Sequence, residues 1–310
     1  MYRLILKRKL KPDEIKKVIK NFDVSPFTTD NITKELNKIK SVNEYVYETN
    51  LVKGTKFHLI TNLRKIDKVL EYYFYVIKLK QKINPGTFFE DCYIYLLPTS
   101  VKKEFKKVIT PNEINSGATN VYPDICGGPV YVWRKEEMYK VLVHETLHSV
   151  LYDASIFKNP YKKFPNMKSL NLNEVYNEFG TIYTMALKER KVLPLLKKQL
   201  ELDKKNVCQM MRLNHLEKLG DFLNPNLYQQ KASFFSYIVL KCLLLDTLLE
   251  KCNKKCLENF WKLGFYGGMN SQFEVLLDKI FKKYENENFN NFCNKTNKQL
   301  KFSVFQKDEI

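Results

Sequence analysis

Residues 139–152 read YKVLVHETLHSVLY, and this stretch decides the fold. It contains no Gly or Pro, and a helix built from it would carry apolar side chains around almost its whole circumference. We therefore expect a buried helix over residues 136–152. Three polar side chains lie on it, His144, Glu145 and His148. Each needs a partner, because an unsatisfied buried polar group costs about 1–3 kcal/mol.

The pattern His-Glu-x-x-His predicts that a metal ion is this partner. Positions four apart share one face of a helix, so His144 and His148 can bind the same Zn²⁺. Glu145 is then placed to act as general base on a water molecule that attacks a carbonyl. The alternative is structural: the imidazoles bond to backbone groups and Glu145 pairs with one of the many lysines. The chain has four histidines, and two of them lie in this pattern.

The residues that follow the pattern separate the zinc peptidase subclasses. A metzincin would have Gly at position 151 and His or Asp at 154, where this chain has Leu151 and Ala154. Downstream, residues 173–178 read NEVYNE. HETLH followed by NEVYNE resembles the gluzincins, the thermolysin-like group of zincin metallopeptidases, in which a helix with the pattern NExxx(D/E) supplies the third metal ligand.

This resemblance implies one Zn²⁺ per chain, held by His144, His148 and Glu174. It also implies that Glu178, one helical turn after Glu174, accepts a hydrogen bond that orients a ligand histidine. Glu178 itself and His215 remain alternatives for the third ligand. A zincin usually adds a Tyr or His donor that stabilises the oxyanion. Tyr237 and His215 are the candidates, although both also suit structural positions.

A strand is expected directly before the active helix, and we expect it to bind substrate. In zincins this strand forms the sheet edge along which an extended peptide lies. The substrate-binding residues would be Val130, Tyr131, Val132 and Trp133. The region from residue 115 through VHETLH also resembles metallopeptidases predicted in large nucleocytoplasmic DNA viruses, with weaker similarity at 235–237. His58 lies on a strand-like run without a partner motif, and we expect it to be structural.

The whole chain is expected to have an α+β, zincin-like fold. Strand-like runs occur at 2–6, 45–49, 57–61, 92–97 and 130–134, with Lys53-Gly54 as a hairpin turn, and helical spacing occurs at 13–22, 32–39 and 66–79. Later helices are expected at 136–152, 172–190, 195–219, 232–251 and 272–284, with a loop at 153–171. These elements predict an N-terminal α+β lobe with the edge strand (1–135), the active-site helix with a helical lobe (136–284) and a peripheral tail (285–310). The active helix would lie in a cleft between the lobes.

Charge and cysteine content limit the possible partners and the cellular compartment. The net charge is +18, and each half of the chain carries +9. Such a field attracts nucleic acid, anionic membranes or acidic protein surfaces, but the sequence contains no phosphate loop or zinc knuckle that would indicate nucleic-acid binding. The seven cysteines form no CxxC pair and are expected to be reduced. With no signal peptide and no membrane span, we expect a cytoplasmic protein, in host cytoplasm or a virion if it is viral.

The sequence thus predicts a zinc-dependent peptidase acting on peptide or protein substrates. Two other classes of function remain open. One is a catalytically inactive zincin scaffold in a structural or virion-associated role. The other is a basic nucleic-acid-binding protein. Retention of Glu145 beside the first histidine argues against the inactive scaffold, because zinc ligands alone would suffice for a structural site.

Overall fold

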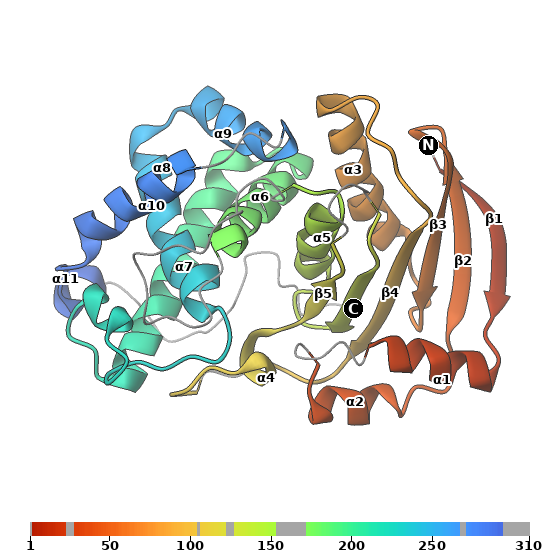
Figure 1. Ribbon diagram of the computed structural model, residues 1–310, viewed down its shortest axis with the longest axis horizontal. Helices are drawn as coiled ribbons and strands as arrows, with labels where there is room; N and C mark the ends of the chain where they lie inside the picture. Colours follow the sequence, from red (N-terminus) through yellow and green to blue (C-terminus); the bar gives the residue numbers. More distant parts are fainter. Residues whose placement is uncertain are drawn as a thin grey trace. The chain divides into compact units, whose positions relative to one another are not determined.

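The computed structural model describes residues 2–22, 28–103, 106–121, 127–152, 172–266 and 271–293. The chain forms two compact units. Unit 1 comprises residues 1–103 and 115–152, and unit 2 comprises residues 104–114 and 153–310. As expected, the fold is α+β, with a sheet in the N-terminal part and helices in the C-terminal part (Figure 1). The predicted loop at 153–171 lies outside the described residues.

Unit 1 contains a six-stranded mixed sheet in the order β1-β2-β3-β4-β6-β5 (Figure 1). β1, β2 and β3 are antiparallel neighbours, β3, β4 and β6 run parallel, and β5 is antiparallel to β6. The strands are β1 (Tyr2–Lys9), β2 (Asn43–Thr49), β3 (Val52–Thr61), β4 (Cys92–Thr99), β5 (Gly117–Thr119) and β6 (Val130–Arg134). All five expected strands are confirmed, and β5 was missed.

Helices pack on both faces of this sheet. One face of the sheet carries α3 (Asp67–Ile83), whose Tyr73 and Phe74 contact Phe57 of β3 edge to face. α5 (Met138–Ser149) packs against α3, β5 and β6. The other face forms an apolar core with α1 (Pro12–Asn21) and α2 (Asp30–Leu36), in which Phe22 meets Tyr131 of β6. The position of α5 is therefore set by the strands β5 and β6 and by the helix α3.

The strand before α5 is not a sheet edge, so that prediction is wrong. β6 pairs with β4 on one side and with β5 on the other. Val130, Tyr131, Val132 and Trp133 are all buried, and Trp133 lies in the apolar core. Their backbone groups form hydrogen bonds with β4 and β5, so β6 offers no open edge on which a peptide could add as a further strand. The three-residue strand β5 forms this edge of the sheet, and β1 forms the opposite one.

The β2–β3 hairpin turns at Asn50-Leu51 rather than at the expected Lys53-Gly54. Gly54 lies inside β3 with φ of 82°, a left-handed conformation that suits glycine. The pairing register shifts at this point, since Glu48 faces Lys56 while Thr49 faces Val52. Gly54 therefore marks a β-bulge, which from sequence resembles a turn. At the outer edge, β1 exposes the apolar side chains Leu4, Ile5 and Leu6.

Unit 2 consists mainly of helices around a core of α6, α7 and α8 (Figure 1). Its elements are α4 (Pro111–Ile114), α6 (Leu172–Lys188), α7 (Val192–Asn214), the 3₁₀-helix η1 (Leu219–Leu223), the π-helix η2 (Phe235–Leu240), α8 (Lys241–Lys251), α9 (Lys254–Tyr266), α10 (Ser271–Tyr284) and α11 (Phe289–Cys293). α7 ends before the expected residue 219, because His215 adopts φ of 56° and closes the helix. The expected helix 232–251 is divided into η2 and α8.

Two further differences concern boundaries. Packing joins α5 to unit 1, so the division between units follows Tyr152, whereas the sequence places the lobe boundary at residue 135. The expected peripheral tail begins at residue 285, but Phe289–Cys293 forms α11, which packs on α7. The chain from residue 294 lies outside the described residues.

The expectation of reduced cysteines is wrong for four of them. Cys208 of α7 is bonded to Cys293 of α11, and Cys252 is bonded to Cys256. Cys92 and Cys242 are free and buried, while Cys126 lies outside the described residues. Spacing alone could not show the first pair, because its members are 85 residues apart. Among the described helices, none combines the length and apolar character needed to cross a membrane.

Candidate metal centre

Helix α5 carries His144, Glu145 and His148 in its last two turns. It ends in a Schellman arrangement: the Tyr152 N–H donates to Leu147 O, and Leu151, in a left-handed conformation, donates to His148 O. The helix is almost entirely buried, as the apolar sequence predicts. His144 and Glu145 are buried as well, with exposed fractions of 5% and 7%. The end of α5 is therefore a fixed, largely desolvated position for these side chains.

The two imidazoles of α5 converge. The Nε2 atoms of His144 and His148 lie 3.2 Å apart, and the rings meet edge to face. Two histidines that each bind Zn²⁺ at about 2.0–2.1 Å in tetrahedral geometry have nitrogens about 3.3 Å apart. The observed separation fits that requirement. Sequence spacing predicted that these residues share one helix face, and in the structure their ring nitrogens are close enough to bind the same ion.

Glu145 is held by the short strand β5. The Thr119 hydroxyl donates to Glu145 Oε2 at 2.9 Å and lies 3.0 Å from the backbone oxygen of Glu145. Gly117, two residues earlier, permits this close approach. A Cβ atom on Gly117 would lie 2.6 Å from Val141 Cγ1, 2.8 Å from Tyr131 O and 2.9 Å from Glu145 Cγ. Any side chain at this position would force the strand and α5 apart.

In unit 2, Glu174 and Glu178 lie one turn apart near the start of α6. Glu178 is buried and accepts a hydrogen bond from the Lys241 ammonium at 3.1 Å. Lys241 also forms an ion pair with Asp203 at 3.1 Å, and Asp203 accepts from Gln199 at 2.9 Å. Sequence reasoning missed this cluster. The expected role of Glu178 toward a ligand histidine stays a prediction.

The charge of Lys241 depends on its two carboxylates. Burial alone would lower its pKa, but Asp203 and Glu178 outweigh that effect and raise the pKa above its ordinary value. The ammonium is therefore charged, and it joins α6, α7 and α8 at one point inside unit 2. Removing one member of such a buried ionic cluster leaves an uncompensated charge. Lys241 is thus a structural determinant of the helix that carries Glu174.

The other candidate residues occupy separate positions. Tyr237 lies in the π-helix η2, four residues before Lys241. His58 pairs with Glu44 at 3.1 Å and stacks on Tyr93, in agreement with the structural role expected for it.

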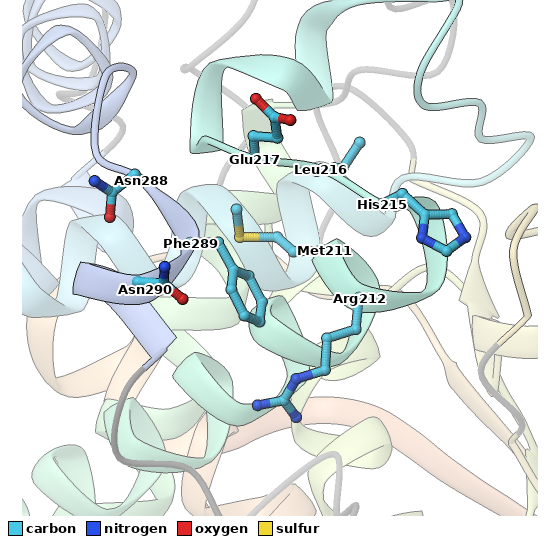
Figure 2. A pocket seen from close by; sticks show the side chains of 8 residues that line it. All are labelled: Met211, Arg212, His215, Leu216, Glu217, Asn288, Phe289 and Asn290. Atoms are coloured by element: carbon cyan, nitrogen blue, oxygen red, sulfur yellow. The ribbon is translucent and has the colours of Figure 1, made fainter.

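His215 ends α7 and lines an open cavity of about 560 Å³ in unit 2 (Figure 2). The cavity is lined by Met211, Arg212, His215, Leu216, Glu217, Asn288, Phe289 and Asn290. Figure 2 shows the charged ends of Arg212 and Glu217 and the imidazole of His215 pointing in different directions. The Arg212 guanidinium lies over the Phe289 ring. The cavity therefore does not gather its ionisable groups around one point.

The donor set itself suits a metal ion. His144, His148 and Glu174 form a group of side chains that could hold one. Two imidazoles and one carboxylate match the ligand types that zinc takes in catalytic sites, where a fourth position stays open to water or substrate.

Comparison with known proteins gives one distant structural match. An aminopeptidase N family protein from Idiomarina loihiensis aligns with a TM-score of 0.42 and 10% sequence identity. The alignment covers 85% of this chain and 48% of the neighbour, so this chain spans about half the neighbour's length. No protein-family model and no curated protein matches the chain.

Sequence reasoning missed Thr119 and Gly117, which lie against Glu145, and the Lys241–Asp203 pair, which is linked to Glu178. β5 has three residues, too few for an alternating strand pattern. The one usable signal was Asn115-Ser116-Gly117, a turn-forming stretch that introduces the strand. Lys241 had a clearer signal, since it interrupts the most apolar run of the chain. A lone lysine in such a run requires a buried anionic partner.

Proposed function

We propose that this protein is a zinc-dependent peptidase, with Zn²⁺ held by His144, His148 and Glu174. The observation that carries the proposal is the 3.2 Å separation of the two Nε2 atoms, with the Glu145 carboxylate beside them on the same helix. Zinc bound there would polarise the carbonyl of a peptide bond and make water a better nucleophile at neutral pH. The ordered donor set and the buried helix both favour this ion over the structural alternative.

Glu145 acts as the general base. Its carboxylate takes a proton from the attacking water while the water oxygen bonds to the peptide carbonyl carbon. The same proton passes to the leaving nitrogen as the carbon–nitrogen bond breaks, so Glu145 returns to its starting state. The position of Glu145, buried and fixed by Thr119, supports this role. Tyr237 is proposed to donate a hydrogen bond to the developing oxyanion.

The peptide substrate is proposed to lie along β5. β6 has strands on both sides, whereas β5 is an edge strand and its Thr119 contacts Glu145. An extended peptide added to this edge would use backbone hydrogen bonds for affinity. The net charge of +18 further predicts a preference for acidic segments, with kcat/KM falling as salt screens the charges.

A combined zinc and peptide-cleavage experiment tests this function. The wild-type protein, purified without chelator, should contain close to one zinc per chain and cleave members of a peptide library. Glu145→Gln should keep its zinc and its fold while losing several orders of magnitude in kcat. Glu201→Gln, an exposed change on α7, is the control and should retain wild-type activity. A zinc-free wild-type protein, or full activity in Glu145→Gln, would rule out the proposed mechanism.

A further inference from the structure

We infer that Thr119 is a positioning residue for the general base, an inference that rests on the proposed function. Glu145 belongs to α5, but the group that orients its carboxylate comes from another element, the edge strand β5. The Thr119 hydroxyl lies 2.9 Å from Glu145 Oε2.

The same hydroxyl also contacts the backbone of the base. It lies 3.0 Å from Glu145 O, so its single proton is shared between a carboxylate oxygen and a main-chain oxygen of one residue. These two contacts restrict both the backbone position of Glu145 and the rotation of its side chain. A hydrogen bond to a carboxylate is stronger than one between neutral groups. Thr119 therefore selects one orientation of the carboxylate.

Gly117 allows β5 to approach α5 closely enough for Thr119 to reach the Glu145 carboxylate. Gly117 and Thr119 are two positions apart on β5 and point to the same face of the sheet, toward α5. Since a Cβ on Gly117 would approach Glu145 Cγ to 2.9 Å, the strand runs in direct contact with the base. Ala118, between them, points to the opposite face and lies in the apolar core with Tyr131. The strand is thus anchored on one face and positions Glu145 with the other.

This arrangement joins substrate binding and catalysis in one strand. In the proposed function the edge of β5, which no other described strand pairs with, receives the peptide backbone, and its Thr119 side chain orients the base. A shift of β5 would then move the substrate and the carboxylate together. Small errors in the position of a catalytic group lower the rate of the chemical step, by up to about 100-fold for 1 Å. Thr119 should consequently affect kcat much more than KM.

Two variants of Thr119 and one matched control test the inference. Thr119→Val keeps the shape of the side chain and removes the hydroxyl, while Thr119→Ser keeps the hydroxyl. Thr55→Val makes the same chemical change at a buried threonine whose hydroxyl donates to Phe89 O at 3.0 Å, in the same unit. Thr119→Val should lower kcat about 10- to 100-fold with KM little changed. Its zinc content should equal that of wild type.

Rescue and control results decide whether the effect is specific. Thr119→Ser should recover kcat to within about three-fold of wild type. Thr55→Val should keep the wild-type kcat even if its melting temperature falls. Wild-type kcat in Thr119→Val, or equal losses in the Val and Ser variants, would overturn the inference.

A readout that needs no activity separates this inference from the proposed function. Crystal structures of the metal-free full-length variants should show the Glu145 carboxylate in a new orientation in Thr119→Val and in its original one in Thr119→Ser. An unmoved carboxylate in Thr119→Val would refute positioning by Thr119. Absence of zinc and of hydrolysis in the wild type would refute the peptidase instead, and the crystallographic comparison would still decide the role of Thr119.

Discussion

The Nε2 atoms of His144 and His148 lie 3.2 Å apart at the end of a buried helix. At this distance both ring nitrogens can face a single metal ion. An i, i+4 spacing makes the approach possible, but the rotamers of both rings are needed to achieve it. The buried, Schellman-capped end of α5 supplies the rigid backbone from which both rings project.

Metal binding should depend on this pair. His148→Ala is expected to lose zinc, because a two-ligand remnant of the site binds the ion weakly. Zinc that binds only the folded state raises the melting temperature, so chelator-treated wild type should gain thermal stability on zinc addition and His148→Ala should not. Elemental analysis and thermal scans measure both effects. His58→Ala, which removes a histidine of the same unit, should bind zinc as wild type does; full stoichiometry in His148→Ala would contradict the assigned site.

Gly117→Ala should damage both stability and activity. The added methyl group would meet Val141, Tyr131 and Glu145 at 2.6–2.9 Å, closer than van der Waals contact permits. Overpacking of this kind typically costs about 1–3 kcal/mol. Urea unfolding should show that loss, and kcat should fall because β5 moves away from Glu145. A variant with wild-type stability and kcat would mean that β5 does not approach α5 as described.

Lys241→Met should be strongly destabilising. The change leaves Glu178 and Asp203 buried without their cation, and breaking a buried ionic cluster costs about 3–5 kcal/mol. The triple variant Lys241→Met, Glu178→Gln, Asp203→Asn removes every charge and should regain much of the lost stability. Chemical denaturation of the three proteins measures both steps. Equal stability of Lys241→Met and wild type would refute the ionic cluster.

Alkaline pH should unfold the protein partly through buried tyrosines. Burial raises the pKa of Tyr183 from 10.0 to about 12. The folded state therefore keeps a proton that the unfolded state releases, so stability is complete below pH 10 and is lost as pH rises from 10 to about 12.

The Tyr183 prediction is measured by urea unfolding at pH 8 and pH 11. Tyr183→Phe should reduce the difference in the free energy of unfolding between the two pH values. Tyr266→Phe, which changes a ring with 60% exposure, should not. A pH dependence that is the same in Tyr183→Phe and wild type would show that Tyr183 does not contribute.

Patterns of local sequence predicted the long elements well. The spacing of apolar residues predicted α5 and α6, and the start of α10 to within one residue. Those helices bury wide faces, so their periodicity is strong. The elements that were predicted wrongly are determined by contacts between residues far apart in the sequence. The division of the helix at 232–251 into η2 and α8 is one case, because a π-turn has no local composition signal.

The residues of the candidate centre also fall into those that could be predicted from sequence and those that could not. His144, Glu145 and His148 could be identified because one helix carries all three at a fixed spacing. The contact from Thr119 to Glu145 spans 26 residues, and the one from Lys241 to Glu178 spans 63. Both contacts depend on how strands and helices pack in three dimensions. The spacing of residues along one helix or strand carries no information about this packing. β5 shows the consequence: sequence placed the sheet edge at Val130–Arg134, and the added short strand moved it to Gly117–Thr119.

The outer strand β1 has a consequence for handling the protein in solution. Leu4, Ile5 and Leu6 are 41–47% exposed, and no other described strand pairs with the outer edge of β1. Such an edge can pair with the edge strand of a second chain. Lys7 and Lys9 follow in the same strand, and their like charges oppose such pairing between two chains. At 1 M salt the Debye length falls to about 3 Å, which removes this repulsion. Colloidal stability should therefore be greatest in dilute buffer, and concentrated salt should promote filament-like precipitation that begins at this edge.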